Sequence, residues 1–182
     1  MKHIFILIFM FLSVTKTHSF TGVYLGWENF ISPALPFDTK ADSLTFGIIG
    51  NTPTRVYFYY NMLGHFVLTR GAVQGNLGWG LDLAGGIGYR FLNAAHKKSG
   101  WDVGLDIFGY FTPFFLNSET TYTEIALYYG LGLGLSTVYK INPYIGVGFR
   151  ASIKYNLGSD YLASGQPSTQ GLIFTLGTLI TF

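Results

Sequence analysis

Few residue types in this chain could carry catalytic or metal-binding chemistry. The sequence contains four histidines and no cysteine, and only His65 and His96 lie beyond the first 19 residues. His65 stands in the stretch MLGHFVL without a neighbouring serine. Nucleophilic catalysis needs a hydroxyl or thiol beside its base, and metal sites need several converging ligands. We therefore expect no catalytic residues, no cofactor site and no metal site.

Two glycine-rich stretches are similar to nucleotide-binding loops only in composition. Residues 130–134 read GLGLG and residues 85–90 read GGIGYR. Neither continues as GxGxxG at the start of a helix, and no lysine follows as in a phosphate-binding loop. Lysine and arginine are not clustered either, so nucleic-acid binding is not supported.

The charged residues are the remaining candidates for chemistry, and they follow a pattern. Charged side chains make up 11% of the chain, against about 25% in an average soluble domain. Nine of them stand among glycines and tyrosines in stretches of alternating residue type, and these nine are expected to line an interior: Glu28, Arg55, Asp82, Arg90, Asp102, Asp106, Glu124, Arg150 and Lys154.

The alternation itself predicts β-strands. In IALYYGLGLGLSTVY, residues 125–139, bulky apolar residues occupy one parity and glycine or small residues mostly the other. Successive side chains of a strand point to opposite faces, so this segment has one face of bulky apolar side chains and one face of mostly small residues. Eight such segments occur, at about 20–28, 42–50, 55–64, 76–91, 101–112, 125–139, 144–155 and 171–182.

The apolar faces carry almost no charge, which decides the environment. A soluble sandwich or barrel would show many Lys, Glu and Asp residues on its outer face. Here the charges share a face with glycine, which packs nothing against water but leaves room inside a narrow barrel. Short connections at 51–54 and 140–143 alternate with longer ones. We predict an all-β fold over residues 20–182, an eight-stranded antiparallel up-and-down transmembrane β-barrel with lipid outside and both termini on the periplasmic side.

Residues 1–19 have the pattern of a cleaved signal peptide. Lys2 precedes an apolar run from Ile4 to Val14, which is too short to span a bilayer. Removal of this segment takes two of the 11 basic residues, Lys2 and Lys16, and leaves nine basic and nine acidic residues. Export with this architecture predicts an outer-membrane location.

The ending FTLGTLITF alternates Phe174, Leu176, Ile180 and the terminal Phe182 on one face. This resembles the C-terminal signature of bacterial outer-membrane barrels, and over residues 20–182 the chain is similar to the OmpW/OmpX/OmpA-transmembrane group, with OmpW-like proteins nearest. The resemblance implies outer-membrane lipid and the barrel-assembly machinery as partners, with no cofactor.

The interior charges and the apolar loops leave the function open between alternatives. The charges predict either a salt-bridged plug, which we favour, or the constriction of a narrow pore. Apolar residues in the segments 30–37, 65–69 and 113–116 predict either a taller barrel or a hydrophobic mouth for small apolar solutes, formed by Phe30, Ile31, Leu35, Phe37, Phe66, Leu68, Phe114 and Phe115.

Three classes of function follow from this layout. The first hypothesis is a narrow channel or a conduit for small, hydrophobic solutes. The alternative is a non-conducting surface or structural barrel whose loops bind host or envelope partners. Lipid A deacylases of the PagL type also use an eight-stranded barrel, but the local His–Ser spacing expected for such an enzyme is missing.

Overall fold

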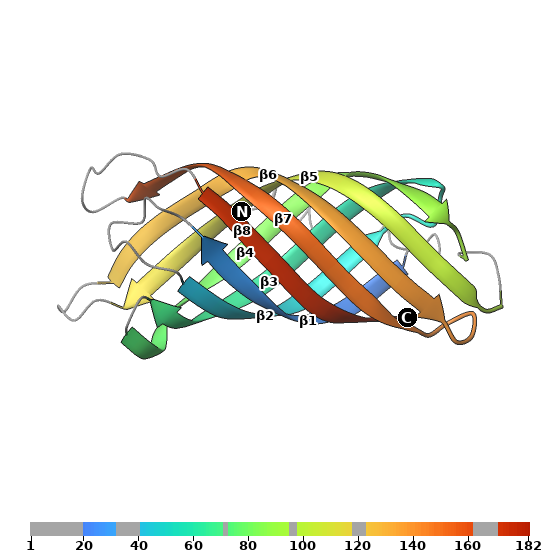
Figure 1. The fold of residues 1–182 in the computed structure, drawn as a ribbon, viewed down its shortest axis with the longest axis horizontal. Helices are drawn as coiled ribbons and strands as arrows, with labels where there is room; N and C mark the ends of the chain where they lie inside the picture. Colours follow the sequence, from blue (N-terminus) through green and yellow to red (C-terminus); the bar gives the residue numbers. More distant parts are fainter. Residues whose placement is uncertain (1–19, 32–40, 71–72, 95–97, 118–122, 162–170) are drawn as a thin grey trace, which may run out of the picture.

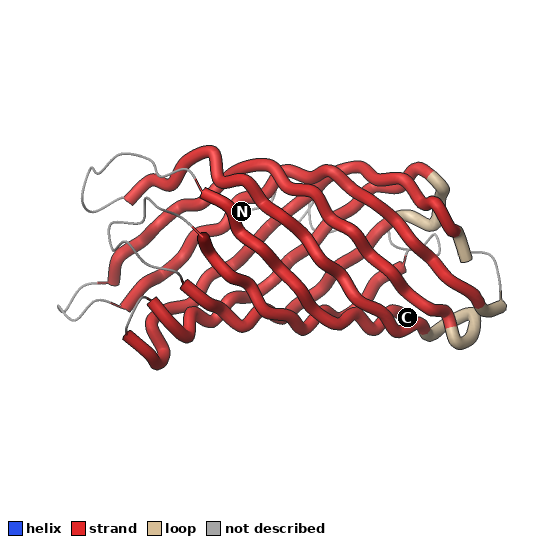
Figure 2. The backbone as a smooth tube through the Cα atoms, viewed as in Figure 1, coloured by secondary structure: helices blue, strands red, loops and turns tan. Residues whose placement is uncertain are grey.

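The computed structural model is a closed barrel of eight antiparallel strands in sequence order (Figures 1 and 2). The structure describes residues 20–31, 41–70, 73–94, 98–117, 123–161 and 171–182. The strands are β1 Phe20–Ile31, β2 Ala41–Asn51, β3 Val56–Arg70, β4 Val73–Leu92, β5 Gly100–Asn117, β6 Thr123–Lys140, β7 Gly146–Tyr161 and β8 Gly171–Thr181. No helix within the described residues is long and apolar enough to cross a membrane. The predicted signal peptide, residues 1–19, lies outside the described residues.

The first and last strands close the barrel. β1 pairs with β8 over ten positions, from Gly22 opposite Thr181 to Ile31 opposite Leu172. At the end of this seam the Phe182 amide donates to the Thr21 carbonyl at 2.9 Å. The first and last described residues therefore meet at the same end of the barrel as the short turns. Closure gives the edge strands β1 and β8 partners for their backbone groups, as a barrel in lipid requires.

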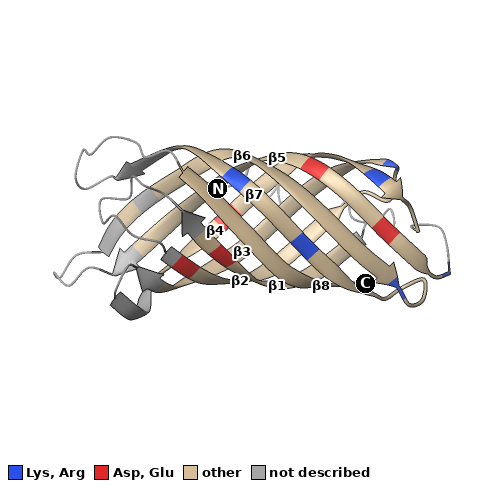
Figure 3. Ribbon diagram, viewed as in Figure 1, with Lys and Arg blue, Asp and Glu red and all other residues tan. Residues whose placement is uncertain are grey.

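The two faces of the wall are oriented as the alternation predicts. Leu133 and Leu176 point outward, with 51% and 62% of their surface exposed, whereas Asp106 and Arg150 point into the lumen with 1% and 3% exposed. Figure 3 shows how few charged residues the strands carry. Glycines make room for large rings inside: a Cβ on Gly132 would stand 2.4 Å from Phe108, its neighbour across the β5–β6 pair.

The strands are longer than predicted at the end opposite the short turns. The segments 65–69 and 113–116, expected in loops, belong to β3 and β5. The alternation continues through them, with His65 and Val67 inside and Phe66 outside. Because apolar residues occupy both faces there, the periodic signal disappears from the sequence although the backbone ladder continues.

The short turns are fixed by local hydrogen bonds. Between β6 and β7, the Asn142 side-chain oxygen accepts from the Tyr144 and Ile145 amides, both at 2.8 Å. Between β2 and β3, the Thr52 hydroxyl accepts from the Phe58 amide at 3.0 Å. Asn and Thr side chains commonly replace backbone partners in this way, which allows tight connections.

Candidate functional site

The lumen holds three groups of charged side chains at successive levels. We name them by their cations. The lysine cluster contains Lys154, Glu28, His65, Asp82 and Thr112; the arginine cluster contains Arg150, Asp106, Tyr57 and Tyr59; the turn-end cluster contains Arg90, Asp102, Asn51, Thr52 and Thr54. The lysine and arginine clusters contain ion pairs between strands that are not neighbours in the wall, so both clusters cross the barrel interior. In the turn-end cluster Arg90 and Asp102 stand on the neighbouring strands β4 and β5, and Arg90 also reaches the β2–β3 turn.

One ammonium group holds two carboxylates in the lysine cluster. The Lys154 Nζ lies 2.7 Å from Glu28 Oε1 and 2.8 Å from Asp82 Oδ2, and thereby connects β7 with β1 and β4. The second Glu28 oxygen lies 2.6 Å from His65 Nδ1, and the Thr112 hydroxyl donates to Asp82 at 3.0 Å. All of these side chains are buried. The cluster is a polar bridge across the lumen rather than an exposed binding site.

The wall beside the lysine cluster carries polar atoms without protein partners. Among the described residues, Tyr24 OH, Ser43 Oγ, Thr45 Oγ1 and His65 Nε2 are buried and form no hydrogen bond. The register brings them together, since Ser43 pairs with Glu28 and Thr45 pairs with His65. Burying a polar group without a partner is unfavourable. The polar atoms on this side of the lumen therefore have fewer hydrogen-bond partners than the ion pairs beside them.

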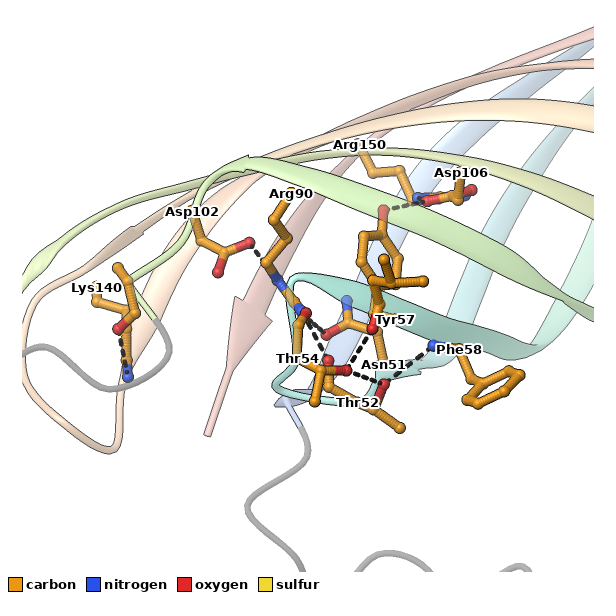
Figure 4. A network of polar contacts seen from close by, with 12 residues as sticks. Asn51, Thr52, Thr54, Tyr57, Phe58, Arg90, Asp102, Asp106, Lys140 and Arg150 are labelled. Atoms are coloured by element: carbon orange, nitrogen blue, oxygen red, sulfur yellow. Dashed lines mark hydrogen bonds and ion pairs between the residues drawn. The ribbon is translucent and has the colours of Figure 1, made fainter.

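The arginine cluster is tighter (Figure 4). Arg150 Nη1 donates to Asp106 Oδ2 at 2.8 Å and Nη2 donates to Oδ1 at 2.6 Å, so the pair is bidentate. Tyr57 adds a hydrogen bond to Asp106 Oδ2 at 3.0 Å. The Arg150 guanidinium also lies over the Tyr59 ring, 4.1 Å from its centroid. A planar guanidinium matches a carboxylate in two bonds and stacks on aromatic rings at the same time.

The turn-end cluster ties the lumen to the β2–β3 turn (Figure 4). Arg90 Nε lies 3.0 Å from Asp102 Oδ1, and Arg90 Nη1 donates to the Thr52 carbonyl at 2.7 Å. The same guanidinium also donates to the Thr54 carbonyl and to the Asn51 side chain. One side chain thus supplies donors that the turn backbone needs at this end of the barrel.

Apolar and aromatic side chains fill space between these levels. The Phe114 ring is tilted against the His65 ring, with centroids 5.5 Å apart, and meets the Tyr128 ring edge-on at 5.3 Å. Tyr59 and Phe108 pack at 5.2 Å beside the arginine cluster. The interior of an eight-stranded barrel is just wide enough to be filled by side chains, and these rings occupy part of it.

The structure places all but one of the described lumen charges on the inner face, the exception being Arg55. Seven of the nine are buried inside: Glu28, Asp82, Arg90, Asp102, Asp106, Arg150 and Lys154. Arg55 is exposed in the β2–β3 turn and lies over the outward Tyr89 ring, 5.4 Å from its centroid, because β3 begins only at Val56. The expectation for Arg55 was therefore wrong, and the side chain of Glu124 lies outside the described part.

The expected hydrophobic mouth does not form as one surface among its described members. Phe66 points outward and is 44% exposed, whereas Phe114 is buried in the lumen. Leu68 and Phe115 are half-buried, with Phe115 stacked on the outward Trp79 at 4.3 Å. Phe66 and Phe114 both lie in strands, and they are separated because they point to opposite faces of the wall. Leu35, Phe37 and the side chains of Phe30 and Ile31 lie outside the described part.

Phe174, Leu176 and Ile180 point outward on β8, and Phe182, directly after this strand, is exposed as well. His96 lies outside the described residues. Sequence reasoning placed Tyr24, Ser43 and Thr45 on the inner face but missed His65 as a lumen residue. The parity of His65 with Tyr57 and Asn61 was the available signal, and it was overlooked because the segment was assigned to a loop. Within the described residues no group of three or more His, Cys, Asp and Glu side chains could hold a metal ion.

No protein-family model matches the chain, and no curated protein sequence matches it. Solved structures do. Neisserial surface protein A is 10% identical with a TM-score of 0.64, and the match covers 91% of this chain and 97% of that one. The outer membrane protein OprG from Pseudomonas aeruginosa is 14% identical with a TM-score of 0.51, covering 90% and 96%. At such identities the likeness concerns the fold, which is that of the eight-stranded outer-membrane β-barrels.

Proposed function

We propose that this outer-membrane barrel is closed to bulk solutes. It serves as a structural protein of the envelope whose loops contact host or envelope partners. One observation carries the proposal: two levels of buried ion pairs cross the lumen one after another, and a third buried pair, Arg90 with Asp102, lies at the turn end, where Arg90 reaches the β2–β3 turn. Solutes would have to pass both levels in series. Opening any level would leave buried charges without partners, which is strongly unfavourable.

The rings between the ion pairs support the same conclusion. Phe108 packs on Gly132, and Tyr57 packs on Gly88, so the small residues of the inner face are already covered by side chains. The loops at the end opposite the short turns would then present the protein to host or envelope partners, as the sequence suggested. Cleavage after residue 19 and recognition of the outward C-terminal series by the assembly machinery belong to the same proposal.

The closed state is tested by conductance in a planar lipid bilayer. Purified wild-type protein, shown to be folded by a heat-dependent shift in electrophoretic mobility, should insert without discrete current steps. A large porin inserted under the same conditions serves as the positive control. Regular, reproducible steps from the folded wild-type protein would contradict the proposal.

A narrow, gated channel is the second candidate, and a specific observation favours it. The four unsatisfied polar atoms beside the lysine cluster would be stabilised by water or by a small hydrated ion on that wall. If current steps occur, Thr45→Val should reduce their size because it removes one of these hydroxyls. Thr175→Val is the matched control, since Thr175 is already hydrogen-bonded to Ser152. Equal effects of the two substitutions would speak against a path along this wall.

Binding of partners by the loops is tested separately from conductance. Replacing residues 32–40 and 162–170 by short Gly-Ser linkers should leave the heat-dependent mobility shift intact. It should lower the attachment of cells producing the protein to a cultured epithelial monolayer by at least several-fold. Unchanged attachment would remove the loops as the binding element.

A further inference from the structure

We infer that a groove in the outer wall of the barrel, across β5, β6, β7, β8 and β1, binds one acyl chain of a membrane lipid. The groove has a volume of about 540 Å³. This lies within the usual range for small-molecule sites, roughly 300–1,000 Å³. It opens on the outward face, which in this architecture meets hydrocarbon.

A single small side chain makes the groove. Leu105, Leu135, Ala151, Leu176 and Trp27 form one continuous row across the five strands, each residue paired with the next. Four members of this row are large, exposed side chains, and Ala151 has only a methyl group. The wall is therefore indented at β7 between its taller neighbours.

The floor and the sides of the groove are suited to a hydrocarbon chain. Gly134, Ser152 and Thr175 also line it, although their positions face the lumen, so backbone forms part of the floor. Ile153 and Phe174, from the next row, complete the sides. A chain lying here would contact side chains on both sides, which a smooth lipid-facing wall does not offer, and dispersion contacts add up over such a surface.

The lining is almost wholly apolar, and at one end of the groove stand two side chains with polar groups. Trp27 and Asn29 both line it, and both donate to the Asp42 carboxylate, Trp27 Nε1 at 3.1 Å and Asn29 Nδ2 at 2.6 Å. These residues lie toward the end of β1 and β2 that carries the long connection between them. A lipid has the same arrangement, an apolar chain joined to a hydrogen-bonding head region. This correspondence selects a lipid over a wholly apolar solute as the occupant.

Trp27 provides a built-in reporter, because the chain has only three tryptophans. In the test, Trp79 and Trp101 are replaced by Phe, and the protein in mild detergent is titrated with a phospholipid carrying brominated acyl chains, which quench tryptophan at contact. We expect Trp27 fluorescence to fall in a saturable manner near one lipid per protein. A variant that keeps only Trp101, outward and outside the groove, should show weak, non-saturating quenching.

Filling the groove provides the decisive variant. Ala151→Phe should abolish the saturable quenching of Trp27, and native mass spectrometry should show loss of the one retained lipid. Val147→Phe, outward on the same strand but not lining the groove, is the matched control and should keep both signals. Saturable quenching that survives Ala151→Phe, or equal quenching of Trp27 and Trp101, would overturn the inference. Neither measurement depends on conductance, so the inference and the proposed closed lumen fail separately.

Discussion

The lysine cluster and the arginine cluster solve the same problem in different ways. Both place a cation from β7 against carboxylates in the lumen, with Lys154 and Arg150 four residues apart on the inner face. Arg150 makes two bonds to one carboxylate, whereas Lys154 divides its ammonium between Glu28 and Asp82. The arginine pair is surrounded by tyrosine rings, and the lysine pair borders polar atoms without partners.

The difference shows that two ion pairs can be equally buried and still differ in rigidity. A guanidinium fork fixes distance and orientation together, so little rearrangement is possible without losing both bonds. A lysine ammonium is a point charge on a flexible stem, and the hydroxyls and imidazole beside it offer substitute partners. The lumen therefore has one rigid level and one adaptable level.

The largest effect is expected from removing the cation of the rigid level. Arg150→Met leaves Asp106 buried with only the Tyr57 hydroxyl among its described partners, and should lower the free energy of unfolding by about 3–5 kcal/mol. Urea titration of the protein in lipid vesicles measures this. Arg55→Met, on the exposed arginine of the turn, should cost less than about 1 kcal/mol.

The same substitution in the adaptable level should cost less. After Lys154→Met, Glu28 keeps His65, Asp82 keeps Thr112, and Ser43 stands opposite Glu28 in the β1–β2 register. We expect a loss of about 3 kcal/mol in the same titration, the lower end of the range for breaking a buried ion pair, because both carboxylates keep these partners. A loss equal to or above that of Arg150→Met would remove the distinction between the two levels.

Deleting one hydroxyl compares a hydrogen bond to a charged partner, in the arginine cluster, with one to a neutral partner elsewhere in the lumen. Tyr57→Phe removes a hydrogen bond to the Asp106 carboxylate and should cost about 1.5–3 kcal/mol. Tyr110→Phe removes a 3.3 Å bond to the neutral Asn156 side chain and should cost about 0.5–1.5 kcal/mol. Because ring size is unchanged, both values report the hydroxyl; a reversed order would contradict the proposed rigidity of the arginine cluster.

The smallest expected effect tests the packing under the rigid pair. A Cβ on Gly134 would stand 2.1 Å from Arg150 Nη2 and 2.5 Å from Asp106 Oδ1, so Gly134→Ala should destabilise by about 1–3 kcal/mol. At Gly109 the nearest atom would be 3.9 Å away, and Gly109→Ala should change stability by no more than about 0.5 kcal/mol. If both variants match the wild type in the same titration, the pair is less tightly held than its geometry indicates.

The sequence predicted much of the fold because the physical signal repeats in every strand. Leu133, Val147 and Leu176 stand on the predicted lipid face, and Asp106 and Arg150 stand inside. The prediction was wrong where the signal changes character. Around His65 and Phe114 apolar residues occupy both faces, so strands were taken for loops, and Arg55 was assigned to a strand that starts one residue later.

The sequence could not predict which of the interior charges pair with one another. Lys154 could have met any of the five acidic residues expected in the lumen, and 126 positions separate it from Glu28. Only the register of each strand pair and the closure of β1 on β8 bring these two groups to the same level. The groove at Ala151 has the same origin, since it depends on which residues of four other strands share its row.

The sequence by itself determined which face of the wall meets lipid and which lines the lumen. The alternation has a period of two, and the residue composition of each face indicates its environment. The sequence also determined that the chain must close, since an open edge in hydrocarbon is too costly. The tertiary structure decided which charges meet, which polar atoms lack partners and where the outer surface is indented. These depend on register between strands, a relation between distant segments that no local pattern records.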